Sequence, residues 1–324
     1  MNTTVTTRHA TRRTAVRSPR RPWRRGPRGW FPASGYARTA PYLFLTPFLC
    51  VFAAFILAPL GYALYLSLFR TELVGGQVFV GLANYARALH DGAFYAGLGR
   101  VALFFVMQVP IMLVLALVFA LILDSGTLRL RHVFRLGFFI PYAVPSVVGA
   151  LMWGYLYGRQ FGPIDQLTAG IGLHKPDLLA APAMLPALSN IVSWEYTGYN
   201  MIILFAALQA VPAELRDAAA VDGAGPVRFA LRVKVPLIRP AIVLTTIFSI
   251  IGSFQLFTEP QIMSALAPTV IGTSYTPNLY AYNLSFTNQQ YEYSAAISFF
   301  LGIVTFAGSY TFMWWVNRRA RSSS

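Results

Sequence analysis

Long apolar stretches with almost no charge limit what this sequence can fold into. A helix that crosses a bilayer needs about 20 apolar residues, because the hydrocarbon core is ~30 Å thick and each residue rises about 1.5 Å. Six stretches with at most one charge reach roughly that length: residues 39–69, 101–123, 136–158, 186–213, 240–258 and 293–317. Only 11% of all residues are charged, against about 25% in soluble domains. The sequence predicts an all-α membrane protein with six transmembrane helices.

The Lys and Arg residues lie mainly in alternate connecting segments. Twenty-one of the 26 fall in the N-terminal arm, the second and fourth connections and the C-terminal tail. Positive residues collect on the cytoplasmic side of membrane proteins. Both termini are therefore predicted to be cytoplasmic, in a multi-pass protein of the bacterial cytoplasmic membrane. This topology accounts for the net charge of +15, and nucleic acid is not expected as a partner.

The charge pattern divides the chain into three regions. Residues 1–39 form a basic arm that is expected to be disordered, residues 40–317 the six-helix transmembrane domain, and residues 318–324 a basic cytoplasmic tail. The arm holds ten Arg and no acidic residue, which is also typical of a mitochondrial transit peptide or a nucleic-acid-binding arm. All the connecting segments fit one topology with a cytoplasmic N-terminus, which favours a tail that sets the orientation of the protein in the membrane.

The connection between the fourth and fifth stretches, residues 212–240, is too long for a simple turn between helices, where about 2–8 residues are usual. Turn and helix signals divide it. A helix is expected over Glu214–Val221, a turn at Asp222-Gly223, and a second helix from Pro226 to about Val233 that ends before Val235-Pro236. Two short helices rich in small residues would form a projection that fits the cleft of a partner.

This segment resembles the coupling loop, or EAA motif, of ABC importer permeases. The motif reads Glu-Ala-Ala, then three residues to a Gly, then an apolar run that ends near a Pro. Asp217 stands where the family has Glu, so the charge is kept on a side chain one methylene shorter. The resemblance implies that the ATPase-coupling residues are Glu214, Asp217, Ala218, Ala219, Asp222, Gly223, Phe229 and Pro236.

Three further segments, Pro41–Leu68, Phe138–Gly158 and Ser253–Met263, resemble the carbohydrate branch of these permeases. The nearest type is the first permease subunit of maltose, lactose, glycerol-phosphate and multiple-sugar systems. One departure follows Met263, where SALAPT replaces the Thr-Gly-Gly-Pro common in the family. The resemblance implies a type I (MetI-like) permease fold, a second homologous permease subunit, two ATP-binding subunits and an extracytoplasmic solute-binding protein.

Polar and aromatic residues share one face in each of two spans, at i, i+3, i+4 and i+7. Those in the fourth stretch are Val192, Glu195, Tyr196 and Tyr199, and those in the fifth are Ser249, Gly252, Ser253 and Leu256. Aromatic faces with a few hydrogen-bonding groups suit a sugar, although the small residues of the fifth stretch could equally pack helices. In the maltose-type permease, these faces line the sugar site. The isolated carboxylate of Glu195 either faces the cargo or pairs with a base on a partner.

Several catalytic signatures are missing from the sequence. It contains no Gly-x-x-x-x-Gly-Lys-Ser/Thr loop, no Gly-x-Ser-x-Gly elbow and no HExxH, so no catalytic residue, metal or cofactor is assigned to this chain. Its one cysteine, Cys50, and four histidines show no metal-ligand spacing. ATP and Mg²⁺ are expected to be used by a partner ATPase. The prediction is a sugar permease subunit that lies in membrane lipid and is not itself an enzyme.

Two alternatives remain at this point. A permease of the same architecture could carry glycerol phosphate, an amino acid or another small polar solute, although a phosphate would favour basic groups that the fourth and fifth stretches lack. A stand-alone six-span enzyme or channel would need a buried catalytic cluster or a symmetric pore face. Neither feature is visible in the sequence.

Overall fold

The computed structural model describes residues 36–321 except residues 73, 127, 159–161 and 164–176, and it divides the chain into two units, Met1–Leu57 and Ala58–Ser324. The described part of the first unit is α1 (Tyr36–Phe52) and the π-helical turn η1 (Ala53–Leu57). The second unit contains α2 (Ala58–Ser67), β1 (Phe69–Glu72), β2 (Gly76–Phe79), α3 (Ala83–Ala88), α4 (Gly92–Asp124), α5 (Arg131–Ala143), α6 (Ser146–Tyr157), α8 (Ala181–Gln209), α9 (Ala213–Val221), α10 (Pro226–Phe229), η2 (Ala230–Lys234), α11 (Val235–Leu237), α12 (Arg239–Phe254), α13 (Thr258–Leu266), α14 (Pro277–Phe286) and α15 (Tyr291–Arg321). The predicted arm of residues 1–39 lies almost wholly outside the described residues.

The helices confirm the prediction of an all-α membrane protein, with one short hairpin of β1 and β2 added. Three helical runs are long and apolar enough to cross a membrane, namely Pro41–Ser67, Gly92–Asp124 and Tyr291–Val316. Three bent pairs meet the same test together: Arg131–Ala143 with Ser146–Tyr157, Ala181–Gln209 with Ala213–Val221, and Pro226–Leu237 with Arg239–Phe254. If each bent pair is one span, the described residues contain six spans, one for each predicted stretch.

The third span is bent at its centre. The axes of α5 and α6 differ by 95°. Pro145 forces the preceding residue out of the helical region, and Val144 adopts an extended backbone with φ −76° and ψ 130°. Pro110, by contrast, lies inside the continuous helix α4. Pro145 thus divides the third span into two helices that meet at a sharp bend.

Pro236 behaves in the opposite way to the prediction. The second helix of the 212–240 segment does not end before Val235-Pro236 but runs from Pro226 to Leu237, and the chain turns at Ile238. The π-helical turn η2 ends two residues before Pro236. A proline ring clashes with the carbonyl four residues earlier in a regular α-helix. A wider π turn changes that local register, which lets the helix continue past the proline.

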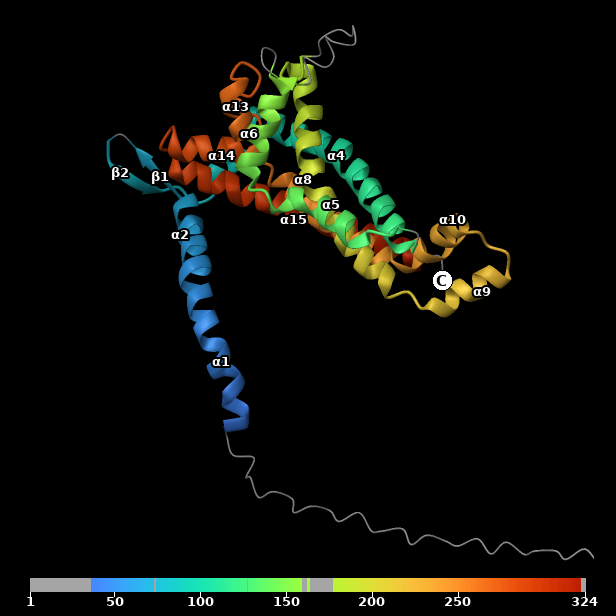
Figure 1. The fold of residues 1–324 in the computed structure, drawn as a ribbon. Helices are drawn as coiled ribbons and strands as arrows, with labels where there is room; N and C mark the ends of the chain where they lie inside the picture. The colour runs from blue at the N-terminus through green and yellow to red at the C-terminus, as the bar shows by residue number, and fades with distance from the viewer. Residues whose placement is uncertain (1–35, 73, 127, 159–161, 164–176, 322–324) are drawn as a thin grey trace, which may run out of the picture. The chain divides into compact units, whose positions relative to one another are not determined.

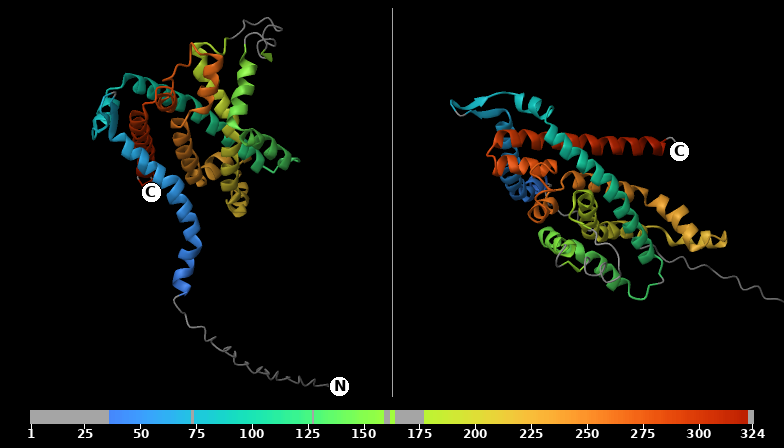
Figure 2. Two further views of the ribbon diagram at one scale, coloured as in Figure 1. Left: turned by 90° about the vertical axis from the view of Figure 1, so that its left-hand side faces the viewer. Right: turned by 90° about the horizontal axis from the view of Figure 1, so that it is seen from above.

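Helices α4 and α8 pack side by side and form the centre of the second unit (Figures 1 and 2). Their shared core near the end of α4 includes Ala120, Leu123, Leu204 and Leu208, all at most 2% exposed. α5 crosses α8 at Gly198, where an added Cβ would lie 1.8 Å from a backbone oxygen of α5. Only glycine allows this close approach of α5 to α8.

The N-terminal end of α4 is joined to α14 and α15 through one carboxylate. Asp91 caps α4 by accepting hydrogen bonds from the backbone N–H groups of Ala93 (2.9 Å) and Phe94 (3.2 Å). Its other oxygen accepts hydrogen bonds from the hydroxyls of Tyr280 (2.8 Å) and Tyr293 (2.6 Å). Burial raises the pKa of Asp91, but these four hydrogen bonds outweigh it and hold the pKa below its usual value. Burial and the bond to Asp91 raise the pKa of Tyr280 to about 12.

Candidate substrate cavity and coupling segment

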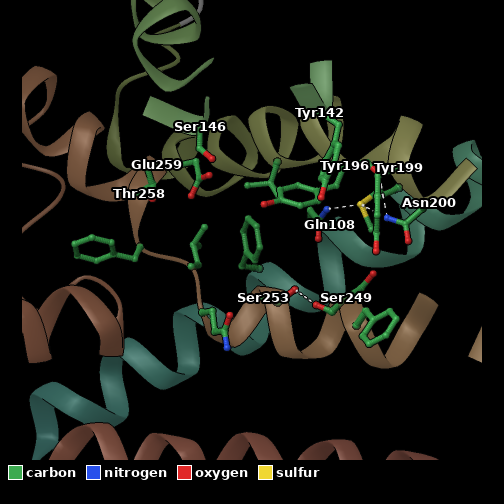
Figure 3. Close-up of a pocket in the computed structure, with 18 residues that line it drawn as sticks. Gln108, Tyr142, Ser146, Tyr196, Tyr199, Asn200, Ser249, Ser253, Thr258 and Glu259 are labelled. Atoms are coloured by element: carbon green, nitrogen blue, oxygen red, sulfur yellow. Dashed lines mark hydrogen bonds between the residues drawn. The ribbon is translucent and has the colours of Figure 1, made fainter. Parts of the chain in front are cut away.

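A cavity of about 400 Å³ lies among α4, α5, α6, α8, α12 and α13 (Figure 3). Three tyrosines on its wall give it the name tyrosine cavity. It is lined by Phe104, Gln108, Met112, Tyr142, Ser146, Val192, Tyr196, Tyr199, Asn200, Phe248, Ser249, Gly252, Ser253, Gln255, Leu256, Phe257, Thr258 and Glu259. Ligand pockets in proteins usually measure about 300–1,000 Å³. The cavity can therefore hold a small solute in the interior of the helical bundle.

The tyrosines form a cluster that joins α5 to α8. Tyr142 stacks on Tyr199 with ring centroids 4.7 Å apart, and meets Tyr196 edge-on at 5.7 Å. The bend at Pro145 places the end of α5 against this face of α8. The cluster is thus fixed by packing and offers aromatic surface with phenolic hydroxyls to the cavity.

Neutral polar groups supply seven of the other fifteen residues of the lining. Gln108 on α4 is 2% exposed and Asn200 on α8 is 3% exposed. The side-chain amide of Gln108 donates to the sulfur of Met112 at 3.1 Å, and that of Asn200 to the backbone oxygen of Tyr196 at 3.0 Å. On α12, the hydroxyl of Ser253 donates to the backbone oxygen of Ser249 at 2.8 Å. Much hydrogen-bonding capacity of these groups stays unused and faces the cavity (Figure 3).

Seven of the eight residues predicted for the substrate pathway line this one cavity. They are Val192, Tyr196 and Tyr199 from α8, Ser249, Gly252 and Ser253 from α12, and Leu256 just after it. The structure therefore brings the two predicted faces together. Whether they contact a cargo is a separate question, and the assignment of these residues to a substrate pathway stays a prediction.

Glu195 is the eighth predicted residue, and it lies outside the lining. It is 4% exposed, hydrogen-bonds to the side chain of Ser146, and has one carboxylate oxygen without a partner in the described part of the chain. At about 100° per residue, Glu195 lies about 40° beyond the edge of the helix face that carries Val192, Tyr196 and Tyr199. The carboxylate that does line the cavity belongs to Glu259 on α13.

Sequence reasoning missed Glu259, Gln108 and Asn200. Asn200 follows Tyr196 by one helical turn, so the spacing of the fourth stretch could have found it. Gln108 is an isolated polar residue in an apolar span, which is a functional signal by default. Glu259 comes directly after the fifth stretch, and only the turn after α12 brings it back to the cavity. No pattern in the sequence indicates that return.

The coupling segment, residues 212–240, forms the projecting pair of helices that the sequence predicts (Figure 1). None of the residues in α9 is buried, so the predicted coupling residues Glu214, Asp217, Ala218 and Ala219 lie on a helix available to a partner. Of the other predicted coupling residues, Asp222 and Pro236 are exposed, whereas Phe229 is buried at 6% exposure.

Gly223 ends α9 in a Schellman motif. Its φ is +72°, its N–H donates to the oxygen of Ala220 at 3.1 Å, and the N–H of Ala224 donates to the oxygen of Ala219 at 2.9 Å. Residues with a Cβ rarely adopt this left-handed conformation. Glycine is thus required at this turn by the backbone, since an added Cβ would meet no atom within 4 Å.

One ion pair ties the coupling segment to the long helix α4. The ammonium of Lys234 in η2 contacts the carboxylate of Asp124, the last residue of α4. The side-chain amide of Gln209, the last residue of α8, donates to the other oxygen of Asp124 at 2.5 Å. The side chains of Asp124 and Lys234 are only 7% and 16% exposed. We call this group of three residues the Asp124 tether.

An internal cavity between membrane helices and an exposed, projecting segment tied to one of those helices are typical of a membrane transport subunit. The family comparison gives the same class. A model described as "Binding-protein-dependent transport system inner membrane component" matches residues 77–322. The chain belongs to this family, as a multi-pass inner-membrane subunit of an ABC importer that works with a binding protein.

Relatives of known type agree with the family. The lactose transport system permease protein LacF of Rhizobium radiobacter is 32% identical over 265 residues, which cover 80% of this chain and 87% of that protein. The arabinooligosaccharides transport system permease protein AraP of Bacillus subtilis is 29% identical over 279 residues, which cover 85% and 88%. These names identify the carbohydrate branch that the sequence resembles.

Solved structures confirm the fold. A chain of a bacterial ABC transporter involved in the import of the acidic polysaccharide alginate superposes with a TM-score of 0.75 at 17% identity, covering 87% of this chain and 97% of that chain. The same transporter in complex with an alginate pentasaccharide-bound periplasmic protein gives a TM-score of 0.73. The fold is therefore that of a type I (MetI-like) ABC importer permease.

Proposed function

We propose that this permease carries a sugar, either a mono- or an oligosaccharide, through the tyrosine cavity. The observation that carries the proposal is the combination of Tyr142, Tyr196 and Tyr199 with the amides of Gln108 and Asn200 on one cavity wall. The C–H faces of a sugar pack on aromatic rings while its hydroxyls need hydrogen-bonding partners. The transport of lactose and arabinooligosaccharides by similar permeases supports this cargo class.

The charges of the cavity favour a neutral cargo over a phosphorylated one. No Lys, Arg or His is among the described residues that line it, and Glu259 is. An anion would enter without a cationic partner and close to a buried carboxylate, which is costly at low dielectric. A permease for sn-glycerol-3-phosphate is also similar to this chain, at 32% identity over 66% of it. The lining of the tyrosine cavity does not favour glycerol phosphate as the cargo of this chain.

The energy for transport would come from partners. We infer that two ATP-binding subunits use ATP and Mg²⁺, that this chain binds no cofactor itself, and that a second homologous permease completes the pathway. The coupling segment supports this arrangement, because α9 projects with no buried residue and ends in a defined turn at Gly223. Closure of the ATPases would then move α4 through the Asp124 tether and switch the cavity between the two sides.

The orientation we propose places both termini and the coupling segment in the cytoplasm. Two observations support it. The basic residues collect in alternate connections. In addition, α15 ends on the same side of the second unit as α9 and α10, as Figures 1 and 2 both show. The Asp124 end of α4 would accordingly be cytoplasmic and the Asp91 end external.

Uptake into proteoliposomes that contain the complete importer tests the cargo. Lactose, maltose, an arabinooligosaccharide and glycerol 3-phosphate would serve as probes for wild type, Tyr199→Phe and Tyr199→Leu. We expect wild type to take up at least one sugar. Tyr199→Phe should nearly retain this uptake and Tyr199→Leu should reduce it tenfold or more, because only Phe keeps the stacked ring.

Tyr155→Leu is the matched control, since Tyr155 is exposed and does not line the cavity. Equal uptake by both Leu variants, or uptake of glycerol 3-phosphate alone, would contradict the proposal.

A further inference from the structure

A second cavity, of about 580 Å³, lies at the Asp124 end of α4 and shares no lining residue with the tyrosine cavity. Four of its eight lining residues are basic, so we call it the basic cavity. Arg129, Arg131, His132 and Arg135 line one side of it, and Leu123 of α4 and Phe205 of α8 are among the residues on the other. The membrane orientation accounts for basic residues in this connection, but not for a cavity formed between them and the ends of α4 and α8.

The arginines of the basic cavity have no anionic partner in the described part of the chain. No acidic side chain lines the cavity, and the nearest carboxylate, Asp124, is already bound by Lys234 and Gln209. Arg131 and Arg135 lie one turn apart on α5, where two like charges repel each other. An anion bound between them would remove that repulsion and complete the charge balance of the site.

The exposed face of α5 shows at which depth this anion would bind. Val133, Leu136 and Ile140 lie on the face of the helix opposite Arg131 and Arg135, and each is more than 50% exposed. A helix with one apolar exposed face and one basic face lies at the boundary between headgroups and acyl chains. At that depth the abundant anions are the phosphates of acidic phospholipids. A soluble acidic protein would instead have to cover bare apolar surface.

We propose that the basic cavity binds the phosphate headgroup of an acidic phospholipid of the cytoplasmic leaflet. Arg131 and Arg135 hold the phosphate, since the planar guanidinium binds phosphate with two parallel hydrogen bonds. Phe205, which is only partly buried, contacts the apolar part of the lipid. Basic pockets between transmembrane helices on the cytoplasmic side are known to bind acidic headgroups.

The site lies next to the coupling machinery. Gln209 lines the basic cavity and also donates to Asp124, which binds Lys234 of the coupling segment. A lipid in the cavity would therefore contact one member of the Asp124 tether, Gln209, directly. The proposal rests on the cytoplasmic placement of this end, but its test reads lipid binding without transport, so its failure would leave the sugar-transport proposal standing.

Lipid binding to the purified full-length chain in neutral detergent tests the proposal. Native mass spectrometry would count retained lipid, and thermal unfolding would be followed during titration with phosphatidylglycerol, phosphatidylcholine or inorganic phosphate. We expect wild type to retain phosphatidylglycerol and to be stabilised by it, but not by the other two. Arg131→Gln/Arg135→Gln should weaken the apparent Kd for phosphatidylglycerol at least tenfold. Arg216→Gln/Arg228→Gln, which removes two exposed arginines of the coupling segment, should bind as wild type does.

Three outcomes would overturn the proposal. An equal loss in both double variants would mean that the lipid is held by diffuse surface charge. Stabilisation by inorganic phosphate to the same extent would identify a soluble anion as the ligand. The third outcome is that Arg131→Lys/Arg135→Lys and Arg131→Gln/Arg135→Gln both bind phosphatidylglycerol as tightly as wild type does. The two arginines would then have no part in lipid binding. The Lys variant keeps the charge but not the paired hydrogen bonds, so we expect it to fold as wild type and to bind three- to tenfold more weakly.

Discussion

The two ends of α4 carry carboxylates that are stabilised in different ways. Asp91, just before the helix, accepts hydrogen bonds from two backbone N–H groups and two tyrosine hydroxyls, all of them neutral donors. Asp124, the last residue of the helix, is bound by the cation of Lys234 and by the amide of Gln209. Aspartate thus stands at both ends of the helix, with neutral hydrogen-bond donors at one end and an ion pair at the other.

The helix dipole explains the difference. A negative charge is favoured by about 0.3–1 kcal/mol at the N-terminus of a helix and disfavoured by a similar amount at the C-terminus. Asp91 therefore needs only the hydrogen bonds of its neighbours, whereas Asp124 needs a cation. That cation comes from the coupling segment, whose α9 has no buried residue. One end of α4 is completed by the bundle itself, and the other depends on the segment that we propose moves with the ATPase.

Removal of Lys234 should have the largest effect on this contrast. Lys234→Met leaves the buried Asp124 carboxylate at a helix C-terminus without a cation. We expect a loss of about 3 kcal/mol in the free energy of unfolding, the lower end of the range for breaking a buried pair. Urea unfolding of the detergent-purified chain would measure it. Arg232→Met is the matched control, since Arg232 is exposed and lies two residues earlier in the same π-helical turn.

The double variant Asp124→Asn/Lys234→Met separates the charge from the packing. With both charges removed, most of the lost stability should return. If the double variant is no more stable than Lys234→Met, or if Arg232→Met costs as much, the ion pair does not hold the coupling segment to α4.

The contrast between the two ends also shows what the sequence could and could not predict. Uncharged stretches predicted the spans, and a residue spacing of three and four predicted the face with Val192, Tyr196 and Tyr199. Prolines were less predictable, because Pro110 continues a helix while Pro145 separates two. The local sequence indicates that a proline destabilises a regular helix. It does not indicate whether the neighbouring helices pack against a bent or a continuous helix.

Contacts between segments that are far apart in the chain could not be predicted from the sequence either. Asp124 and Lys234 are 110 positions apart, and Asp91 and Tyr293 are 202 apart. Glu259 lines the tyrosine cavity only because the chain turns back after α12. Each of these depends on how helices cross, for which the close approach at Gly198 is one determinant. Hydropathy and spacing describe a helix face but not the helix that will meet it.

Gly223→Val should have an intermediate effect at the coupling end. Gly223 has φ +72°, and Gly225, two residues later, has φ −66°. A left-handed backbone costs an L-residue roughly 1–2 kcal/mol, so Gly223→Val should weaken retention of the ATPase by about five- to thirtyfold. The measurement is the amount of ATPase that copurifies with the tagged importer from mild detergent.

Gly225→Val provides the matched control, because it adds the same side chain where the backbone accepts it and no atom lies within 4 Å. It should retain the ATPase as wild type does. If wild type itself purifies without any ATPase, the coupling role of this segment is wrong. Equal losses in the two variants would show that the added side chain, not the backbone conformation, disturbs the docking surface.

Asp91→Asn should have the smallest effect, and its pH dependence distinguishes the two ends. The variant keeps an oxygen for the helix cap but loses the charge that Tyr280 and Tyr293 stabilise, so we expect a cost of about 1 kcal/mol at pH 7. Because the pKa of Asp91 lies below its ordinary 3.8 in the folded protein, its contribution is complete above that value and is lost as the pH falls through the folded pKa. Urea unfolding of both proteins between pH 3 and 7 should therefore show a constant difference that shrinks only below about pH 4. A difference that already shrinks between pH 5 and 7 would mean that the hydrogen bonds at Asp91 do not outweigh its burial, and that this end of α4 also needs a cation.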